Sequence, residues 1–196
     1  MTRSGDRGGS HRRRREVRER SLNKRLLIVC GGARTEKDYL NALRTDRRRS
    51  NISIKICIDE RSPLHVVKKA ADIRSADPDA FDEYWAVFDV DEFDVKSAIA
   101  LAREKGIQLA ISNPCFEYWL LLHFCEINSH LENYKATVGK LKKHLQGYDK
   151  DSLRFSDYSS NVELAIQRAK KRDGQQEPPG VNPNTGVWRV VQYFVT

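Results

Sequence analysis

Short apolar runs alternate with longer amphipathic segments over the first 111 residues. Residues 25–30, 52–58, 84–88 and 108–111 have the length and composition of strands, and 52–58 alternates like a strand near a sheet edge. Apolar positions recur at helical spacing in 35–48, 63–73 and 95–105, and Gly106 provides a stop signal after the third of these segments. This βαβαβαβ order predicts an α/β fold with a mostly parallel central sheet of about four strands, covered by helices.

The remaining sequence is predicted to be mainly helical. Residues 113–124 are apolar nearly all round, with Asn113 as a natural N-cap and Pro114 as a natural first helical residue. Thr185 is placed to cap a last helix that is apolar enough to require packing on the body or on a partner. Two further segments show helical spacing and one is a polar loop, namely 131–145, 162–171 and 175–183. We expect a basic arm over 1–24, an α/β core over 25–125 and a helical extension over 126–196 that packs on the core.

Positive charge is concentrated at the amino terminus. Residues 1–25 hold ten Arg or Lys against three acids, which accounts for +7 of the formal net charge of +8. Such an arm cannot bury a core, and we expect it to be disordered when free. Its arginines, Arg12, Arg13, Arg14 and Arg15 among them, could contact nucleic-acid phosphates or an acidic partner. A purely solubilising tail is the alternative.

The spacing of the cysteines and the absence of long apolar runs favour a cytoplasmic protein. Cys30, Cys57, Cys115 and Cys125 form no C-x-x-C pair, so we interpret them as reduced and mostly buried. A nucleophilic role for Cys30 or Cys115 is a minor alternative. No apolar run approaches the roughly 20 residues of a membrane span, and no apolar signal core follows the basic amino terminus. We therefore expect no membrane partner.

Three aspartates follow the third apolar run directly. Asp89 and Asp91 can point the same way in an extended segment, and Asp94 lies close behind them. Carboxylate oxygens at the carboxyl end of a strand suit Mg²⁺ (or Mn²⁺), so these three are the predicted metal ligands. The alternative is that Asp91 and Asp94 only cap the next helix.

Two glutamates are candidates for completing this site. Glu36 is expected in the first turn of a helix that opens beside the first strand, where its charge suits the helix dipole or a metal. Glu117 lies within an apolar segment, and a buried carboxylate needs a cation, a metal or a hydrogen-bond donor. We therefore assign Glu36, Asp89, Asp91 and Glu117 as candidate catalytic residues. His123 is interpreted as a core histidine with satisfied hydrogen bonds, and His65 as an exposed or capping one.

Three stretches of the chain together resemble the RloB-like proteins. They are Leu-Ile-Val-Cys-Gly-Gly at 27–32 with Thr35, Glu36 and Tyr39, then Phe-Asp-Val-Asp at 88–91, then Ser-Asn-Pro-Cys-Phe-Glu-Tyr-Trp-Leu-Leu-Leu-His-Phe at 112–124. The resemblance runs from about Arg25 onward, and the third stretch is its most specific part. It implies a Toprim-like fold and a place in bacterial anti-phage or restriction-associated loci. Related Toprim-type defence proteins pair with an ATPase and cut nucleic acid, in some cases tRNA. Expected partners are therefore nucleic acid, RNA more than DNA, and an ATPase subunit, with Arg34, Asn113 and the arm arginines contacting substrate.

One position departs from the pattern that this resemblance implies. Toprim domains place a glutamate just after the first strand, where this chain has Gly31. Because that glutamate acts as general acid or base beside the metal, its loss should cost orders of magnitude in rate unless Glu36 replaces it. Three hypotheses follow: a metal-dependent nuclease, a binding or sensor module without catalysis, and a structural subunit that docks through its last helix.

Overall fold

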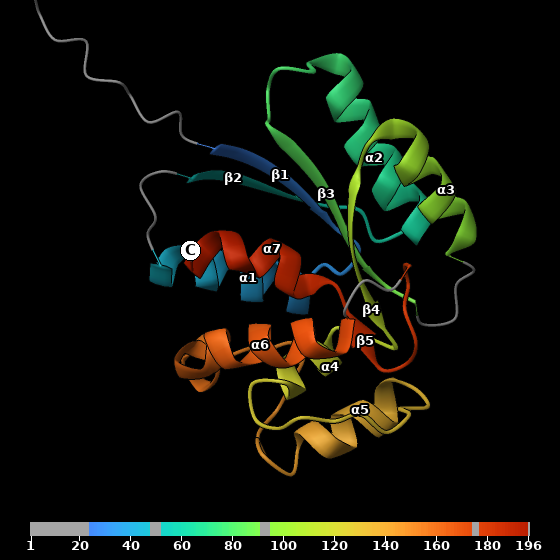
Figure 1. The fold of residues 1–196 in the computed structure, drawn as a ribbon. Coiled ribbons are helices and arrows are strands. Elements are labelled where there is room, and N and C mark those ends of the chain that lie inside the picture. Colours follow the sequence, from blue (N-terminus) through green and yellow to red (C-terminus); the bar gives the residue numbers. More distant parts are fainter. Residues whose placement is uncertain (1–23, 48–51, 91–94, 174–176, 196) are drawn as a thin grey trace, which may run out of the picture.

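The computed structural model describes residues 24–47, 52–90, 95–173 and 177–195. Within these residues five strands form one sheet in the order β2-β1-β3-β4-β5 (Figure 1). The strands are β1 (Lys24–Cys30), β2 (Ile52–Ile58), β3 (Glu83–Asp89), β4 (Gln108–Asn113) and β5 (Asn184–Thr185). The first four are parallel to one another and β5 is antiparallel to β4, so the predicted α/β class and mostly parallel sheet are confirmed. As predicted, β2 lies at a sheet edge.

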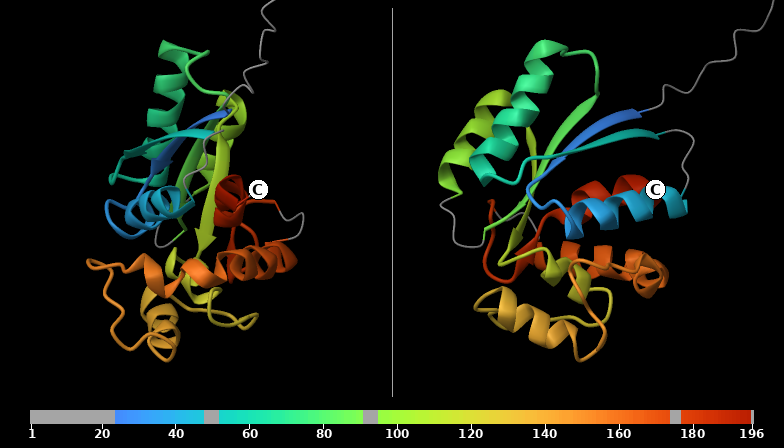
Figure 2. Two further views of the ribbon diagram at one scale, coloured as in Figure 1. Left: turned by 90° about the vertical axis from the view of Figure 1, so that its left-hand side faces the viewer. Right: turned by 180° about the vertical axis from the view of Figure 1, so that it is seen from behind.

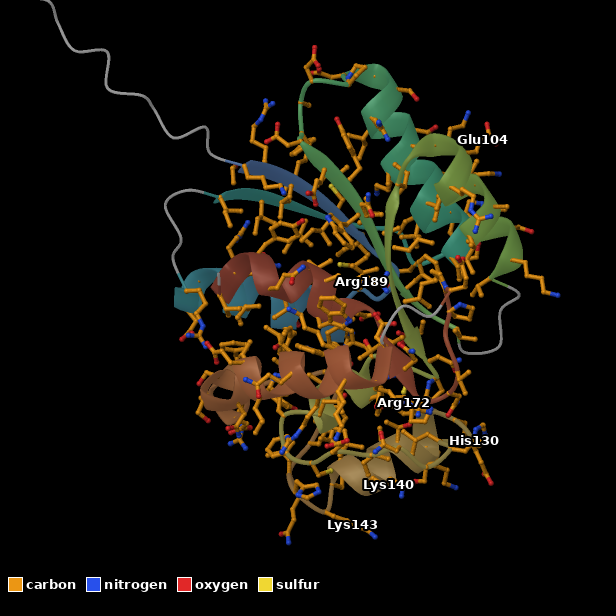
Figure 3. All side chains as sticks on the ribbon, in the orientation of Figure 1. Glu104, His130, Lys140, Lys143, Arg172 and Arg189 are labelled. Carbon is orange, nitrogen blue, oxygen red and sulfur yellow. The ribbon has the colours of Figure 1, made fainter. Side chains whose placement is uncertain are left out.

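Helices cover both faces of the sheet (Figure 2). The helices are α1 (Thr35–Arg47), α2 (Pro63–Ala76), α3 (Lys96–Lys105), α4 (Glu117–Leu121), α5 (Tyr134–Leu141), α6 (Val162–Asp173) and α7 (Val187–Val195). Because side chains alternate along a strand, Leu27 and Val29 of β1 enter the core under α2 and α3, whereas Ile28 and Cys30 enter the core on the α1 side. That second core also takes in buried residues of α4, α6 and α7, whose side chains are drawn as sticks in Figure 3. The last helix therefore packs on the body of the protein.

Two predictions about the second half need correction. The short strand β5 was not predicted, and Thr185 belongs to it, although Thr185 Oγ1 does accept a 3.3 Å hydrogen bond from Val187 N at the start of α7. Asn113 is not a helix N-cap, because it is the last residue of β4 and pairs with Asn184. This strand pairing uses the backbone that the predicted helix would have needed, and α4 begins only at Glu117.

The remaining differences concern helix ends. Helix α1 follows the prediction as far as Arg47, and residue 48 lies outside the described residues, whereas α5 is shorter at both ends than the predicted 131–145. Its N-cap is Asn133, whose side chain accepts a 3.0 Å hydrogen bond from Ala136 N. No helix in the described part of the chain is long and apolar enough to cross a membrane.

Candidate active site

The point where the chain changes direction across the sheet locates a cleft. From β1 the chain moves outward to β2 and then returns to β3 on the opposite side of β1. Ligands of open α/β sheets bind beside such a switch point, at the carboxyl ends of the strands. A cleft of about 160 Å³ lies there, lined by Gly31, Gly32, Glu36, Asp59, Glu60, Ser62, Pro63, Phe88 and Asp89. It therefore brings together the carboxyl ends of β1, β2 and β3.

A second, wider cleft of about 400 Å³ shares part of this lining. Gly32, Glu36 and Glu60 line both clefts, so the two adjoin along the α1 amino terminus. The other lining residues of the wide cleft are Ala33, Arg34, Thr35, Lys150 and Asp151. Arg34 Nη1 lies 2.7 Å from Asp151 Oδ1, and both side chains are largely exposed. The predicted substrate-binding residue Arg34 is thus at the mouth of the wide cleft.

Glu36 is buried in the first turn of α1, with 7% of its surface exposed. Burial raises the pKa of its carboxyl group to about 7, and the nearby Glu117 carboxylate adds to the rise. Hydrogen bonds from its own backbone N–H and that of Gly32 oppose the rise. A Cβ atom at Gly32 would overlap the Glu36 carboxyl group, so glycine is needed there for Glu36 to lie where it does. Glu36 can therefore hold or release a proton near neutral pH.

Asp89 is the last residue of β3 and contributes to the lining of the 160 Å³ cleft. The other two predicted metal ligands, Asp91 and Asp94, lie outside the described residues. Among the residues that the structure describes, no group of three or more His, Cys, Asp or Glu side chains is arranged to hold a metal ion. The residue types in the lining still suit a hard cation, since Glu36, Glu60 and Asp89 are carboxylate residues of one cleft.

Glu117 is buried as predicted and receives a hydrogen bond from the helical extension. Tyr148 Oη donates a 2.8 Å hydrogen bond to Glu117 Oε1. The charge of the Glu117 carboxylate in turn raises the pKa of Glu36. Cys115 lies close to Glu117 and Asp89; burial, followed by these two carboxylates, raises the pKa of its thiol far above the ordinary value. Burial does the same to Cys30. Both thiols stay protonated at neutral pH, which disfavours the nucleophilic alternative.

The sequence interpretation missed the residues that follow β2. Asp59 is buried, and Arg61 binds it through two N–H groups, with Nε 2.9 Å from Oδ1 and Nη2 2.6 Å from Oδ2. These hydrogen bonds lower the pKa of Asp59 to about 2. Asp59, Glu60 and Ser62 all line the cleft. The signal was present, because a run of polar residues directly after a strand beside the switch point is where such a site is expected.

Comparison with known proteins identifies the family. The family model described as "RloB-like protein" matches residues 26–194. The chain belongs to the RloB-like protein family. Searches of curated proteins and of solved structures gave no match. The matched range includes all three stretches that carry the resemblance, and with them Glu36, Asp89 and Glu117 of the cleft region.

Gly31, the position at which the sequence resemblance implied a glutamate, lines the 160 Å³ cleft of this RloB-like chain. Gly31 follows β1 directly, and its N–H donates a 2.8 Å hydrogen bond to Val87 O of β3. A Cβ atom there would lie 3.2 Å from Phe88 Cβ and 3.5 Å from Val66 Cγ2. A side chain at position 31 would therefore start at the wall formed by β3 and α2. Glu36, on the next helix, is one of the carboxylate residues that line this cleft together with Asp89.

The remaining predicted residues of the RloB-like chain have other surroundings. Asn113 Nδ2 donates to Gly180 O at 3.1 Å and its Oδ1 accepts from Asn182 Nδ2 at 3.2 Å, so its side chain anchors the loop before β5, and it lines neither cleft. Arg12, Arg13, Arg14 and Arg15 lie outside the described residues.

Both histidine interpretations can be compared with the structure. His123 is buried, with Nε2 2.9 Å from the Tyr39 hydroxyl and Nδ1 within reach of two backbone carbonyls. Because carbonyl oxygens only accept, Nδ1 carries the proton and Nε2 accepts from Tyr39. Burial lowers its pKa to about 4, so the prediction of a satisfied core histidine is confirmed. His65 lies in the first turn of α2 with Nδ1 2.8 Å from Ser62 Oγ, beside the cleft.

Proposed function

We propose that this RloB-like chain is a Toprim-like nuclease that depends on a divalent cation and serves anti-phage defence. The observation that carries the proposal is that Glu36 and Asp89 line one cleft at the carboxyl ends of β1 and β3. The raised pKa of Glu36 adds a group able to exchange a proton near pH 7. Cleavage of phosphodiester bonds in RNA, including tRNA, is favoured over cleavage of DNA by the family resemblance.

In this proposal Asp89 would hold Mg²⁺ or Mn²⁺ together with Asp91 and Asp94. The ion would neutralise charge on the scissile phosphate and lower the pKa of a bound water. Glu36 would accept a proton from the attacking water or donate one to the leaving oxygen, because its pKa of about 7 allows both the protonated and the ionised form near neutral pH. Glu117, fixed by Tyr148, would keep a buried negative charge near Glu36 and so help to hold the pKa of Glu36 high.

Basic residues around the wide cleft would attract the substrate. Arg34 and Lys150 line the wide cleft, and the arm that precedes β1 carries most of the net charge of the chain. An ATPase subunit as partner and a cytoplasmic site of action belong to the same proposal, and both come from the resemblance and from the sequence. Co-purification of the chain with the products of neighbouring genes tests the ATPase partner.

A cleavage assay tests the nuclease proposal. The chain is incubated with labelled tRNA, single-stranded RNA, single-stranded DNA or duplex DNA, in Mg²⁺, in Mn²⁺ or in EDTA. We expect cleavage of at least one substrate with a cation, none in EDTA, and loss of at least 100-fold in rate for Asp89→Ala. Asp79→Ala is the matched control, because Asp79 is an exposed acid in the turn between α2 and β3. Equal activity of Asp89→Ala and the unmodified chain would remove Asp89 from the site.

Gly31 favours a second candidate, a nucleic-acid-binding or sensor module with impaired catalysis. If the chain binds nucleic acid but does not cut it, Gly31→Glu tests whether the missing carboxylate is the cause. Phe88 would have to move by a few tenths of an ångström to admit the new Cβ atom, whereas Val66 would lie at an ordinary van der Waals distance from it. Gly31→Gln is the matched control, since it has the same shape without the acid. Activity that appears with glutamate and not with glutamine would establish the impaired module.

A further inference from the structure

We propose that Asp59 and Arg61 form a phosphate clamp at the rim of the cleft, in which Asp59 holds Arg61 in place to bind a backbone phosphate of the nucleic acid. The inference rests on the proposed function, because it assigns two residues to substrate binding at that same site. Neither residue is one of the expected metal ligands Asp89, Asp91 and Asp94. Asp59 is a positioning residue in this proposal, and Arg61 is the group that touches the substrate.

The geometry of the pair supports this division of roles. The Asp59 side chain is 5% exposed and the Arg61 side chain 67% exposed, so the carboxylate is fixed inside while the guanidinium faces solvent. Asp59 is itself fixed, since its N–H donates to Cys30 O at 2.9 Å and continues the pairing of β2 with β1. Arg61 N also lies 3.3 Å from Asp59 Oδ1. Glu60 and Ser62, on either side of Arg61, both line the cleft, which places Arg61 at its rim.

The guanidinium keeps hydrogen-bond donors available beyond this pair. A guanidinium group carries five N–H donors, and the two bonds to Asp59 use the Nε hydrogen and one Nη2 hydrogen. Among the described residues, Asp59 is the partner of this group. Both Nη1 hydrogens and the second Nη2 hydrogen therefore point away from the carboxylate, in the forked arrangement that matches two phosphate oxygens.

The charges around the cleft explain why such a clamp is needed. Glu36, Asp59, Glu60 and Asp89 line the cleft and would repel a polyanion. Arg61 neutralises Asp59 on the β2 side, and Lys69 Nζ, 2.6 Å from Ile58 O, adds a positive charge nearby. Arg34 and Lys150 stand on the other side, by the wide cleft. A nucleic-acid strand that crosses the cleft would thus meet basic side chains at both edges of the cleft and acidic side chains between them.

Binding measured without catalysis tests the clamp. The probe is a fluorescein-labelled RNA of about 20 nucleotides, with DNA of the same sequence as single strand and as duplex, titrated with the full chain in EDTA at several salt concentrations. Arg61→Ala should weaken binding roughly tenfold and reduce the salt slope by about 0.7 for a single strand or about 0.9 for a duplex, as expected for one lost phosphate contact. Arg103→Ala is the matched control, because Arg103 is a similarly exposed arginine on α3 that lines neither of these two clefts, and it should change the affinity less than twofold.

The direction in which Asp59→Asn changes the affinity for nucleic acid shows whether Asp59 positions Arg61 or acts only through its charge. This variant makes the cleft more positive, so charge alone predicts tighter binding of nucleic acid. The clamp predicts the opposite, binding weakened about as much as by Arg61→Ala, because Arg61 loses the partner that orients it. Thermal unfolding reports whether the variant is folded. If it is not, Arg61→Lys decides, since lysine keeps the charge without the fork and should recover less than half of the lost binding free energy.

The clamp and the proposed nuclease fail in different ways. Unchanged affinity and salt slope in Arg61→Ala, tighter binding by folded Asp59→Asn, or full binding by Arg61→Lys would each overturn the clamp even if the chain cuts nucleic acid. Failure of the unmodified chain to bind any of the three probes would overturn it as well. Weakened binding by the Arg61 variants, in a chain that cuts nothing with Mg²⁺ or Mn²⁺, would support the clamp and reject the nuclease.

Discussion

Tyr148 Oη donates a 2.8 Å hydrogen bond to Glu117 Oε1, and this bond joins the helical extension to a buried carboxylate that helps to raise the pKa of Glu36 in the cleft. Both side chains are buried. Tyr148→Phe removes the donor and leaves the carboxylate buried, so we expect the free energy of unfolding to fall by about 1–3 kcal/mol. Urea denaturation measures this change. Tyr134→Phe, at a tyrosine with 38% exposure, is the control and should change stability by less than about 0.5 kcal/mol.

The raised pKa of Glu36 predicts a pH-dependent gain in stability for Glu36→Gln. The unfolded carboxyl group loses its proton near pH 4.5, whereas the folded one keeps it until about pH 7. Stability supplied by this group is therefore full below pH 4.5 and is lost as the pH rises to 7. Glutamine does not ionise, so the stability of the variant relative to the parent should increase across this range, by on the order of 2–3 kcal/mol. A difference in the free energy of unfolding between variant and parent that stays constant from pH 4.5 to 7 would contradict the raised pKa of Glu36.

Divalent cations should stabilise the folded chain through Asp89. With Mg²⁺ or Mn²⁺ at about 100 times its dissociation constant, binding adds about 2.7 kcal/mol, which corresponds to a Tm increase of roughly 5 °C or more for a chain of this size. Asp89→Asn should abolish the increase, and Asp79→Asn should retain it. Thermal unfolding with and without the cation provides the measurement, and an equal increase in both variants would place the cation elsewhere.

Gly32→Ala should displace Glu36 without filling the cleft. The added methyl group would occupy the position of the Glu36 carboxyl group, so that side chain must rotate away. If Glu36 exchanges the proton in the reaction, cleavage should slow by at least tenfold. Gly139→Ala is the control, since a methyl group there meets open space on helix α5, and we expect it to leave the cleavage rate unchanged while stabilising the chain by about 0.5–1 kcal/mol. Normal cleavage by Gly32→Ala would remove Glu36 from the mechanism.

The four parallel strands and the position of the cleft could be predicted from the sequence. Each strand is a short apolar run with clear boundaries, and the order of strands and helices then requires a parallel sheet with its site at the carboxyl ends. The family followed from the stretch at 112–124, which lies in the matched range. These features are encoded locally, so the pattern of apolar residues was sufficient.

Features that depend on contacts between distant segments could not be predicted. Strand β5 has two residues and exists because Asn184 and Thr185 pair with the end of β4, about 70 positions earlier. The sequence identified Glu117 as buried but could not supply Tyr148 as its donor. It also gave no sign that Asp59 would be paired with Arg61, because a turn of polar residues after a strand is usually solvated.

The core on the α1 side has a consequence for how the protein opens. Val190, Val191 and Phe194 of α7 are buried in the same cluster as Ile28 and Cys30 of β1, a strand with a neighbour on each side in the sheet. Backbone amides exchange with solvent only when the structure around them opens, and segments that share a core open together. Slow-exchanging amides of α7 and of β1 should therefore report one opening free energy. We therefore expect the cleft to belong to a cooperative unit that extends beyond the first 125 residues.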